Sequence, residues 1–351
     1  MIQSFERIVY LVMLSNDTIM AYKPPYSLSS TMIKMVADIT RLIGQLEGYK
    51  LLSGNLKLRR INKVKSVLSS LAIEGNTLTE GEVTAILDGK PVFGPPNEIL
   101  EVQNALRVYD QMDAWKYSAE GDLLDAHRIL MRGLIPSAGK YRQGGVGVVD
   151  GSKVIHIAPP FNRVPYLMGD LFDYLNNYDE ETIIQSCVFH YEFEFIHPFS
   201  DGNGRMGRLW QTMVLMSKFP VMRYVPFETI VHQRQQGYYK ALADSQSVGN
   251  SDPFIYFMLD ALKTALEAET ARTNVVSDFT TRMRAFEENI RQQSFNRKDY
   301  MSFHKDLSPA SASRDLRRAT EERLLIKSGN GRTTTYQFAK TDGPSGKETR
   351  P

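Results

Sequence analysis

The chain has 351 residues, a formal net charge of +2 and 42% hydrophobic residues, which is enough to bury one large core and a smaller one. Its single cysteine, Cys187, rules out an internal disulfide and favours a reducing compartment, so we expect a cytoplasmic protein. The most apolar N-terminal run, residues 8–14, is too short to span a bilayer and lacks a small-residue cleavage site, so we expect neither a membrane anchor nor a secretion signal.

Periodicity and composition divide the chain into five parts and predict a mainly α-helical fold. We expect a loosely attached N-terminal segment, an N-terminal helical region, a central helical core, a basic C-terminal domain and a disordered tail rich in glycine, proline and charge. In chain order these are residues 1–19, 20–110, 111–278, 279–339 and 340–351.

The helix predicted at about residues 60–75 carries one apolar stripe and ends near a glycine. The stripe consists of Ile61, Val64, Leu68 and Leu71. This spacing predicts packing on the core, and Gly75 is a suitable C-terminal stop. Ser70 and Glu74 lie one turn apart. Because the helix dipole disfavours a carboxylate near the C-terminus, we expect a specific cationic partner for Glu74 rather than a solvated carboxylate.

A β-hairpin is predicted at residues 146–157, in a chain that otherwise reads as helical. Asp150-Gly151 stands between two β-branched runs and is a strong signal for a two-residue turn. The second strand contains Val154, Ile155, His156 and Ile157. An exposed hairpin edge is most often only an edge strand, but it can also hold an extended peptide by strand pairing.

The run from His197 to Arg208, HPFSDGNGRMGR, lies between two predicted helices. Gly202 and Gly204 allow the close backbone approach that an anion-binding turn requires. The helix that follows directs its unpaired N–H groups and positive dipole end at the turn. Arg205 and Arg208 are three residues apart and share one face of this helix. Together these features predict a phosphate site.

Two further residues of the run offer acid–base and metal chemistry. His197 is held at a helix end by Pro198, and histidine is the side chain most often used as a general base, so His197 is a candidate for that role. Asp201 offers a hard oxygen ligand of the type that Mg²⁺ takes beside a polyphosphate. Taken singly, a Gly-Asn-Gly is most often a turn and a histidine a structural residue. Their combination within twelve residues favours function.

This run resembles the signature of the Fic family, His-Pro-Phe-x-(Asp/Glu)-Gly-Asn-Gly-Arg-x-x-Arg, and every fixed position is present. The resemblance extends over about residues 24–262. Ser70-Leu-Ala-Ile-Glu74-Gly75 is similar to the mark of the inhibitory helix of Fic proteins, (Ser/Thr)-x-x-x-Glu-(Gly/Asn). Gly139-Lys-Tyr-Arg142 and the hairpin after it resemble the Fic flap.

The resemblance implies a Fic-type helical bundle with a β-hairpin flap, and an enzyme that transfers AMP from ATP to a Ser, Thr or Tyr hydroxyl of a target protein. His197 would be the general base and Asp201 the Mg²⁺ ligand. The phosphate-binding residues would be Gly202, Asn203, Gly204, Arg205 and Arg208. Gly204 favours AMP transfer, because the kinase branch of the family has lysine there. Relatives that transfer UMP or phosphocholine keep most of the motif, so ATP follows from the majority of the family.

Three further sets of residues take roles from the resemblance. Ser70, Glu74 and Gly75 would form the inhibitory site, with Glu74 paired to Arg208 where the γ-phosphate would otherwise bind. The flap residues Val154, Ile155, His156 and Ile157 would hold the target segment. Tyr238 and Tyr239 stand where the family commonly has an aromatic pair near the adenine, although two aromatic residues in a helix are more often core.

The C-terminal part is basic, since residues 291–351 carry 13 lysine and arginine residues against 7 acidic residues. A helix starting at Ser308-Pro309 precedes a hairpin signal at Gly329-Asn-Gly331. The predicted order of two helices and a two-stranded wing resembles a winged helix-turn-helix domain. Fic chains commonly carry such a domain. A DNA-binding face would use Arg314, Arg317, Arg318 and Arg332. The acidic residues Asp315, Glu321 and Glu322 dilute this patch, so a protein-docking or dimerising module is equally open.

Two other activities stay open at this stage. The same site could remove AMP from a modified protein, with Glu74 orienting a water beside the metal, as resemblance to some inhibitory-glutamate Fic proteins implies. Alternatively, the Fic domain could be a nucleotide sensor that regulates DNA binding by the C-terminal domain. The identity of the target protein, self-modification and a homodimer are also left open.

Overall fold

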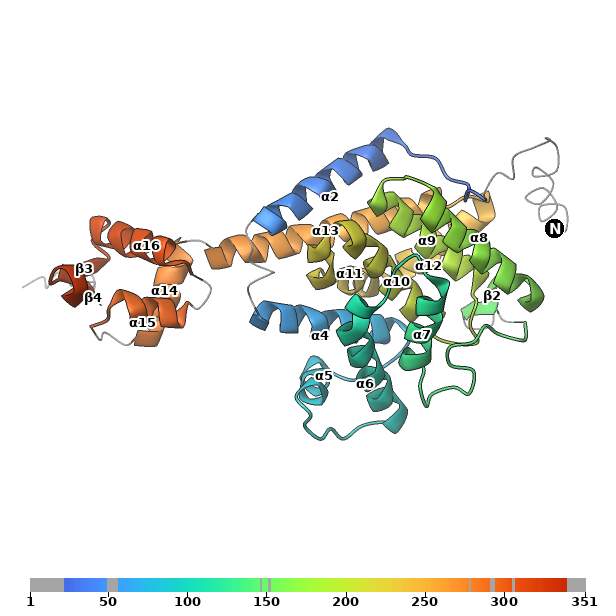
Figure 1. The fold of residues 1–351 in the computed structure, drawn as a ribbon, viewed down its shortest axis with the longest axis horizontal. Helices are drawn as coiled ribbons and strands as arrows, with labels where there is room; N and C mark the ends of the chain where they lie inside the picture. Colours follow the sequence, from blue (N-terminus) through green and yellow to red (C-terminus); the bar gives the residue numbers. More distant parts are fainter. Residues whose placement is uncertain are drawn as a thin grey trace, which may run out of the picture.

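The computed structural model describes residues 22–48, 56–145, 147–150, 153–277, 279–290, 294–304 and 307–339. These residues are mainly helical, with two separate two-stranded antiparallel sheets, which confirms the expected fold class (Figure 1). The predictions for residues 1–19 and 340–351 lie outside the described residues. No helix in the described part of the chain has both the length and the apolar character needed to cross a membrane.

The elements carry the labels of Figure 1, with η for short 3₁₀ helices. In chain order they are α2 (Ser30–Gly48), α4 (Leu56–Ile73), α5 (Glu80–Leu87), α6 (Pro96–Gln111), η1 (Met112–Ala114), α7 (Glu120–Leu130), β1 (Gly147–Asp150), β2 (Lys153–Ile157), η2 (Phe161–Arg163), α8 (Val164–Asn177), α9 (Thr182–Ile196), α10 (Asn203–Lys218), η3 (Pro220–Tyr224), α11 (Phe227–Gln233), α12 (Gln235–Val248), α13 (Asp252–Ser277), α14 (Phe279–Ile290), α15 (Arg297–Phe303), α16 (Pro309–Glu321), β3 (Leu325–Ser328), η4 (Gly331–Thr333) and β4 (Thr335–Phe338).

The main helical body is built around α9, which is buried on nearly every face and packs against α8, α10 and α13. A helix that is apolar all round needs such a position. The Glu181 side chain caps its start by accepting the backbone N–H groups of Ile183 and Ile184. Cys187, in the middle of α9, is fully buried, and burial raises the pKa of its thiol to about 12. The run from His197 to Arg208 therefore starts directly after a helix that is buried on nearly every face.

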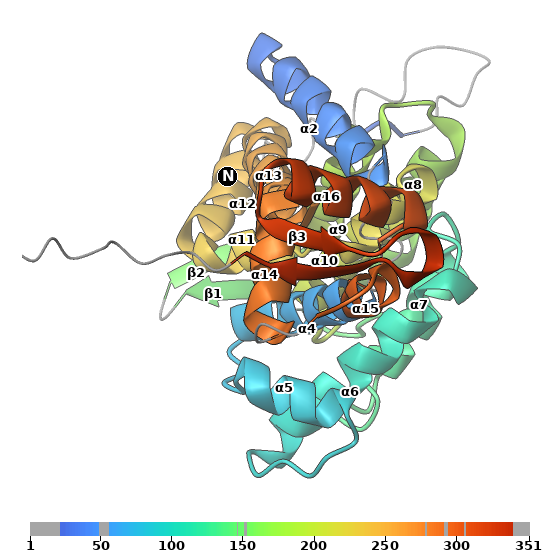
Figure 2. The same ribbon diagram turned by 90° about the vertical axis from the view of Figure 1, so that its left-hand side faces the viewer.

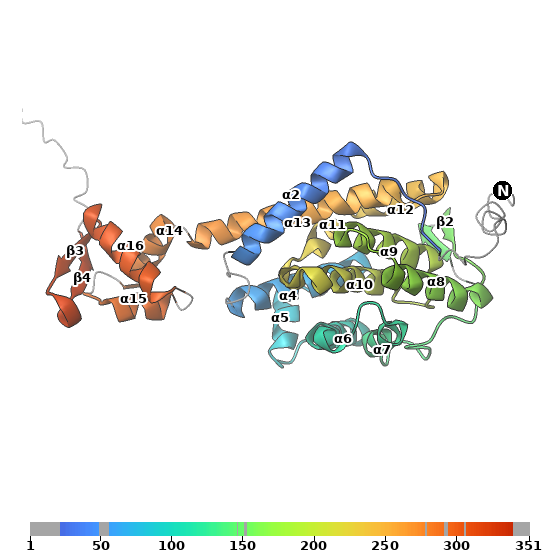
Figure 3. The same ribbon diagram turned by 45° about the horizontal axis from the view of Figure 1, so that its top comes forward.

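The N-terminal helices belong to the same hydrophobic core as α9. In Figure 3, α2 lies along α13, and these two helices pack closely. α4 packs between α6 and α11. On α4 the residues Val64, Val67 and Leu71 are buried, whereas Ile61 and Leu68 are only half-buried. Two of the four predicted stripe residues are thus fully buried, and the buried surface also includes Val67, because α4 packs between two neighbouring helices.

The C-terminal domain has its own core and stands at the far end of α13 (Figures 1 and 2). Ser308 caps α16 by accepting the N–H of Ser311, with Pro309 at the first turn, as predicted. β3 and β4 pair antiparallel across the predicted turn. The turn is longer than predicted, since η4 delays the second strand to Thr335. The order of helices and hairpin is compatible with a winged helix, and that assignment stays a prediction.

Within the C-terminal domain, one acidic residue does not lie where the sequence suggested. Asp315 is 6% exposed and accepts two hydrogen bonds of 2.8 Å from the Arg282 guanidinium. Tyr300 donates a third, of 3.0 Å, to the same carboxylate. The prediction that Asp315 dilutes a basic surface was wrong, because its charge is used inside the domain.

The predicted hairpin is present as β1 and β2, which pair antiparallel with Val148 opposite His156. The register shifts between Val148 and Val149, so the ribbon is irregular near its base. Asp150, predicted as a turn residue, is instead the last residue of β1 and lies opposite Lys153, while Gly151 and Ser152 lie outside the described residues. The strand that contains the four flap residues is therefore confirmed as a strand, and its proposed contact with a target stays a prediction.

Candidate active site

The turn between α9 and α10 is held by its own backbone and by one buried amide. His197 adopts a left-handed conformation with φ 50° and ψ 59°, and Gly202 adopts φ 87°. The Asn203 side chain, 2% exposed, accepts the N–H of Phe199 at 2.9 Å and donates to the carbonyl of the same residue at 2.9 Å. The first N–H groups of α10 have no carbonyl four residues before them in the helix, so they face the enclosed turn as an anion-binding end.

His127 on α7 supports this turn, a role that the sequence analysis did not predict. Its Nδ1 accepts the N–H of Gly139 at 2.8 Å, which leaves Nε2–H to donate to the backbone carbonyl of Asp201 at 3.0 Å. The ring also stacks on Phe199, with centroids 3.5 Å apart. Burial lowers the pKa of His127 to about 4. The imidazole is therefore uncharged, and its two hydrogen bonds support the turn.

Arg142 connects the catalytic turn to the base of the flap. Its side chain is 2% exposed, and Nε donates to the carbonyl of His197 at 2.8 Å. The other guanidinium nitrogens donate to Gly144 at 2.9 Å and Pro159 at 2.5 Å, on the two sides of the hairpin. One buried cation thus fixes His197 relative to both ends of the flap.

Arg208 on α10 is fully buried and is held by the end of α4. Nη2 lies 2.7 Å from Glu74 Oε1 and donates to the Ser70 carbonyl at 2.9 Å, while Nε donates to the Ser70 hydroxyl at 3.1 Å. Glu74 sits in the turn just after α4, and Gly75 has φ 94°. The expected cationic partner of Glu74 is therefore present, and whether the pair inhibits an activity stays a prediction.

Gly204 lies against this ion pair. A Cβ atom at this position would come within 2.3 Å of Glu74 Oε1 and 3.1 Å of Arg208 Nη1. At position 204, any residue with a Cβ atom would force the Glu74 carboxylate to shift from the position in which it pairs with Arg208. The same absence of a side chain leaves room for a phosphate at the helix N-terminus once Glu74 withdraws.

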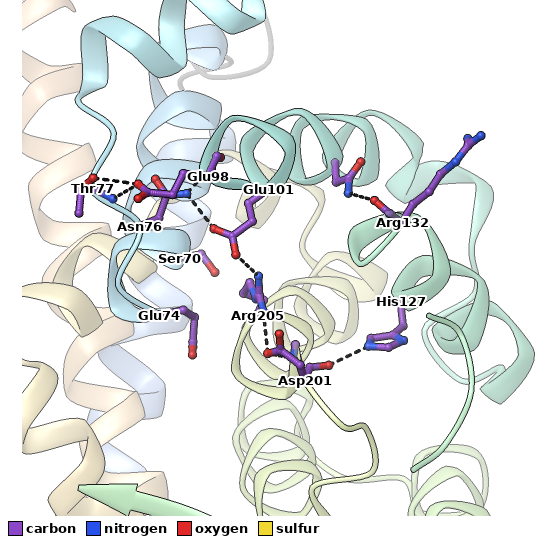
Figure 4. A network of polar contacts seen from close by, with 12 residues as sticks. Ser70, Glu74, Asn76, Thr77, Glu98, Glu101, His127, Arg132, Asp201 and Arg205 are labelled. Atoms are coloured by element: carbon purple, nitrogen blue, oxygen red, sulfur yellow. Dashed lines mark hydrogen bonds and ion pairs between the residues drawn. The ribbon is translucent and has the colours of Figure 1, made fainter. Parts of the chain in front are cut away.

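The sequence placed Arg205 and Arg208 above one anion, but their guanidinium groups have different partners. Arg205 Nη2 lies 2.9 Å from Asp201 Oδ1, and Nη1 lies 3.1 Å from Glu101 Oε1 on α6 (Figure 4). Glu101 was not anticipated, because nothing in its local sequence distinguishes it from a solvated helix residue. Arg208 is turned toward Ser70 and Glu74 instead.

Asp201 is suited to Mg²⁺ only as a single protein ligand. Its side chain is 55% exposed, and Oδ1 already receives Arg205 and the N–H of Gly202 at 2.6 Å. Among the described residues, no group of three or more His, Cys, Asp or Glu side chains could enclose a metal ion. This fits the habit of Mg²⁺ to take one or two carboxylates together with water and substrate phosphates.

The candidate base, His197, is 19% exposed, and its Nδ1 lies 3.8 Å from Glu194 Oε2 one turn earlier on α9. Glu194 is buried and also lies 3.7 Å from His190 Nε2. Burial raises the pKa of Glu194, but the nearby His190 and the charges of His197 and Arg208 outweigh it, so the pKa lies below its usual value. A carboxylate three residues before a helix-terminal histidine was the sequence signal that could have indicated this neighbour.

The two tyrosines predicted near an adenine differ in accessibility. Tyr238 is 1% exposed and lies 3.0 Å from His190 Nε2, among Phe254 and Phe257. Tyr239 is only partly buried, and burial followed by the charge of Glu74 raises its pKa. Tyr238 is thus part of the core. Of the two tyrosines, only Tyr239 has a partly exposed side chain near the end of α4.

Four buried polar atoms around the turn have no hydrogen-bond partner among the described residues: Glu194 Oε1, His197 Nδ1, Arg205 Nε and Arg208 Nη1. Unpaired buried polar groups are costly, and their concentration here is typical of a site that acts on a ligand. A cavity of about 400 Å³ lies elsewhere, lined by residues including Arg60 and Lys63 near the start of α4. Lys63 is 2.5 Å from Asp110, and the lining residues Arg60 and Arg223 pair with Asp88 and Asp113, so we do not assign the nucleotide to this cavity.

One turn brings together a buried arginine, a candidate base and an anion-binding helix end. These features define a class of phosphate-handling helical proteins, and similarity to known proteins identifies the family. The model of the Fic/DOC family matches residues 117–215, which contain α9, the turn and most of α10. A crystal structure of a Fic family protein from Desulfovibrio desulfuricans G20 is 41% identical, covers 92% of this chain and 100% of its own, and superposes with a TM-score of 0.70. The chain belongs to the Fic family.

Several relatives carry the name protein adenylyltransferase. The Fic protein of Nematostella vectensis is 29% identical over 239 residues, which are 64% of this chain and 53% of that protein. The fic-1 protein of Caenorhabditis elegans is 30% identical over 227 residues, 60% of this chain and 42% of that protein. A structure of C. elegans Fic-1, 22% identical with a TM-score of 0.58, shows the shared fold alone. The chain spans about half the length of the curated relatives it matches, or less.

Proposed function

We propose that this protein transfers AMP from ATP to a Ser, Thr or Tyr hydroxyl of a target protein, and that Glu74 restrains this activity. The observation that carries the proposal is the position of Arg208. A fully buried guanidinium beside the open N-terminus of α10 is a strong anion site, and a carboxylate from α4 fills it. The names of the relatives support adenylyl transfer as the reaction.

In the proposed reaction His197 removes the proton of the incoming hydroxyl. The oxygen then forms a bond to the α-phosphorus, the bond from that phosphorus to the oxygen bridging the β-phosphate breaks, and pyrophosphate leaves with the electron pair. The N–H groups at the start of α10 lie where charge develops on the α-phosphate, and Arg208 is placed to bind the outgoing phosphates. Mg²⁺, with Asp201 as its protein ligand, would neutralise part of the phosphate charge.

The restraint follows from competition for one guanidinium. Arg208 can bind either the Glu74 carboxylate or a terminal phosphate oxygen in the same direction. Hydrogen bonds to charged groups contribute about 1.5–3 kcal/mol, so the pair shifts ATP away from the productive pose by about one to two orders of magnitude. Ser70 would stay bound to Arg208 in either state through its hydroxyl, which accepts from Nε, whereas its carbonyl shares Nη2 with Glu74.

The test is to incubate the Glu74→Gly protein with a cell lysate and ATP labelled at either the α- or the γ-phosphate. We expect protein-bound label from the α-phosphate only, and stronger labelling from ATP than from competing GTP, CTP or UTP. Label from the γ-phosphate would indicate a kinase and contradict the proposal. Incubation of wild-type protein with a pre-modified target, without ATP, tests the alternative that the site chiefly removes AMP.

A second candidate function is duplex DNA binding by the C-terminal domain. It is favoured by the burial of Asp315, which leaves Arg314 and Arg317 on the exposed face of α16 without that opposing charge. If α16 enters a major groove, affinity should fall steeply with salt because phosphate contacts release counterions. The test compares wild type with Arg314→Ala/Arg317→Ala in duplex titrations at several salt concentrations. Equal affinity and slope would favour a protein partner.

A further inference from the structure

Arg205 is held between two carboxylates from different parts of the fold. Its side chain is 5% exposed, with Asp201 of the catalytic turn 2.9 Å from one Nη and Glu101 of α6 3.1 Å from the other. Both terminal nitrogens are therefore directed at carboxylates rather than at the space beside Gly204. In this arrangement Arg205 orients Asp201, and Glu101 orients Arg205.

The second oxygen of Glu101 leads back to the inhibitory segment. Glu101 Oε2 accepts a hydrogen bond of 2.8 Å from Asn76 Nδ2, two residues after Glu74 (Figure 4). Asn76 is 9% exposed, and its Oδ1 accepts the N–H of Leu78 at 3.1 Å. The stretch that ends the inhibitory helix is thus fixed to α6 by the same carboxylate that fixes Arg205.

A neighbouring glutamate provides a natural comparison. Glu98, one turn earlier on α6, accepts the N–H of Thr77 at 2.6 Å and its hydroxyl at 2.8 Å. The Glu98 carboxylate thus binds Thr77. The residue of α6 that pairs with Arg205 is Glu101. Glu98 and Glu101 therefore hold the same segment, and they differ in whether they also hold the catalytic turn.

We propose that Glu101 is a positioning residue that couples the end of the inhibitory helix to the catalytic turn through Asn76 on one side and Arg205 on the other. Loss of the Glu101 charge should loosen two parts of the structure together: the residues that follow Glu74, and the Arg205–Asp201 ion pair. The inhibitory role of the coupling rests on the proposed adenylyl transfer, whereas the coupling itself is a property of the folded chain.

The physical coupling is tested by hydrogen exchange on the full chain, which needs no activity. In Glu101→Gln, amides in residues 74–78 and in residues 198–204 should both exchange faster, by about fivefold or more, as coupling free energies in proteins typically give. In Glu98→Gln only residues 74–78 should respond. Amides of α13 serve as the reference for global stability. If residues 198–204 keep their wild-type exchange in Glu101→Gln, the coupling proposal is wrong.

Asn76→Ala tests the coupling from its other end and covers the case in which Glu101→Gln does not fold. Asn76 contacts Glu101 but makes no hydrogen bond to the catalytic turn. Faster exchange in residues 198–204 of this variant supports transmission through Glu101. A change restricted to residues 74–78 contradicts it.

The functional arm uses transfer rates in two backgrounds. In the presence of Glu74, Asn76→Ala should raise the rate about fivefold, and in Glu74→Gly the same change should no longer raise it. In Glu74→Gly, Glu101→Gln should lower kcat about tenfold with KM for ATP within about threefold, because it disturbs orientation rather than phosphate binding. Glu98→Gln should leave kcat unchanged there. Absence of any transfer by Glu74→Gly would refute the proposed function and leave the exchange result standing.

Discussion

Glu74 Oε1 lies 2.7 Å from Arg208 Nη2, and Ser70 holds the same guanidinium through both its hydroxyl and its carbonyl. The arginine is fully buried, whereas the Glu74 side chain is 32% exposed. The cation is therefore fixed and the anion can leave. This asymmetry assigns the movable part of the pair to the end of α4.

The first prediction is that Glu74→Gly raises AMP transfer about tenfold or more, because it removes the carboxylate that competes with phosphate for Arg208. Glu74→Asp should raise it less, since the shorter side chain weakens the pair without removing it. Arg208→Ala should not mimic the release, because it removes the phosphate ligand as well. Labelling rates at saturating ATP check all three. Equal rates for wild type and Glu74→Gly would mean that the pair is only structural.

The second prediction concerns His197. Replacement by alanine should abolish transfer, with a loss of about 10²–10⁴ in rate that is typical for removal of a general base. Binding of ATP should change only a few-fold, because the imidazole handles the acceptor proton and does not hold the phosphates. Calorimetry and labelling of the same preparation separate the two quantities. Near-normal labelling by His197→Ala would exclude it as the base.

The third prediction concerns the metal. Asp201→Ala should lose Mg²⁺-dependent transfer, since Asp201 offers an exposed carboxylate in the turn. Asp201→Asn is the matched control, because it keeps the shape of the contact with Arg205 but weakens metal binding. Transfer rates are measured across a Mg²⁺ titration and with EDTA. If EDTA leaves wild-type transfer unchanged, Asp201 has another task.

The fourth prediction concerns pH and His127. Its pKa is about 4 in the folded protein against 6.5 as the ordinary value, so only the unfolded chain gains a proton as the pH falls below 6.5. Folding stability should therefore be complete above pH 6.5 and be lost on acidification, by about 2 kcal/mol at pH 5 from this group alone. Urea unfolding of wild type and His127→Gln gives the free energy of unfolding of each protein at pH 7.5 and pH 5. The loss of stability between the two pH values should be larger in wild type. Equal losses in the two proteins would show that the imidazole is not held neutral.

Local sequence was sufficient for the elements that position the site. The two helices on either side of the catalytic turn and the cap of α16 follow from periodicity and from residues within one turn of each helix end. The partner of Glu74 was reached through the family resemblance, since two residues 134 positions apart cannot be paired from composition alone.

What the sequence did not reveal depends on contacts between distant helices. His127 and Glu101 look like ordinary helical residues until α7 and α6 are brought to the catalytic turn, and only then do they support Asp201 and Arg205. Asp315 was misjudged for the same reason, because an acidic residue on a basic helix reads as exposed until Arg282 is placed beside it. Side-chain direction on a helix is set by what packs there, which periodicity describes only coarsely.

The space at Gly204 restricts how such a protein can evolve toward higher activity. A methyl group there would collide with Glu74 Oε1 and expel the inhibitory carboxylate, but it would also stand beside Arg208 Nη1, in the place a phosphate must enter. One substitution would thus relieve the restraint and block the substrate together. Under selection for faster turnover, activating changes should accumulate at position 74 and in the segment behind it, while position 204 stays glycine in restrained and unrestrained lineages alike.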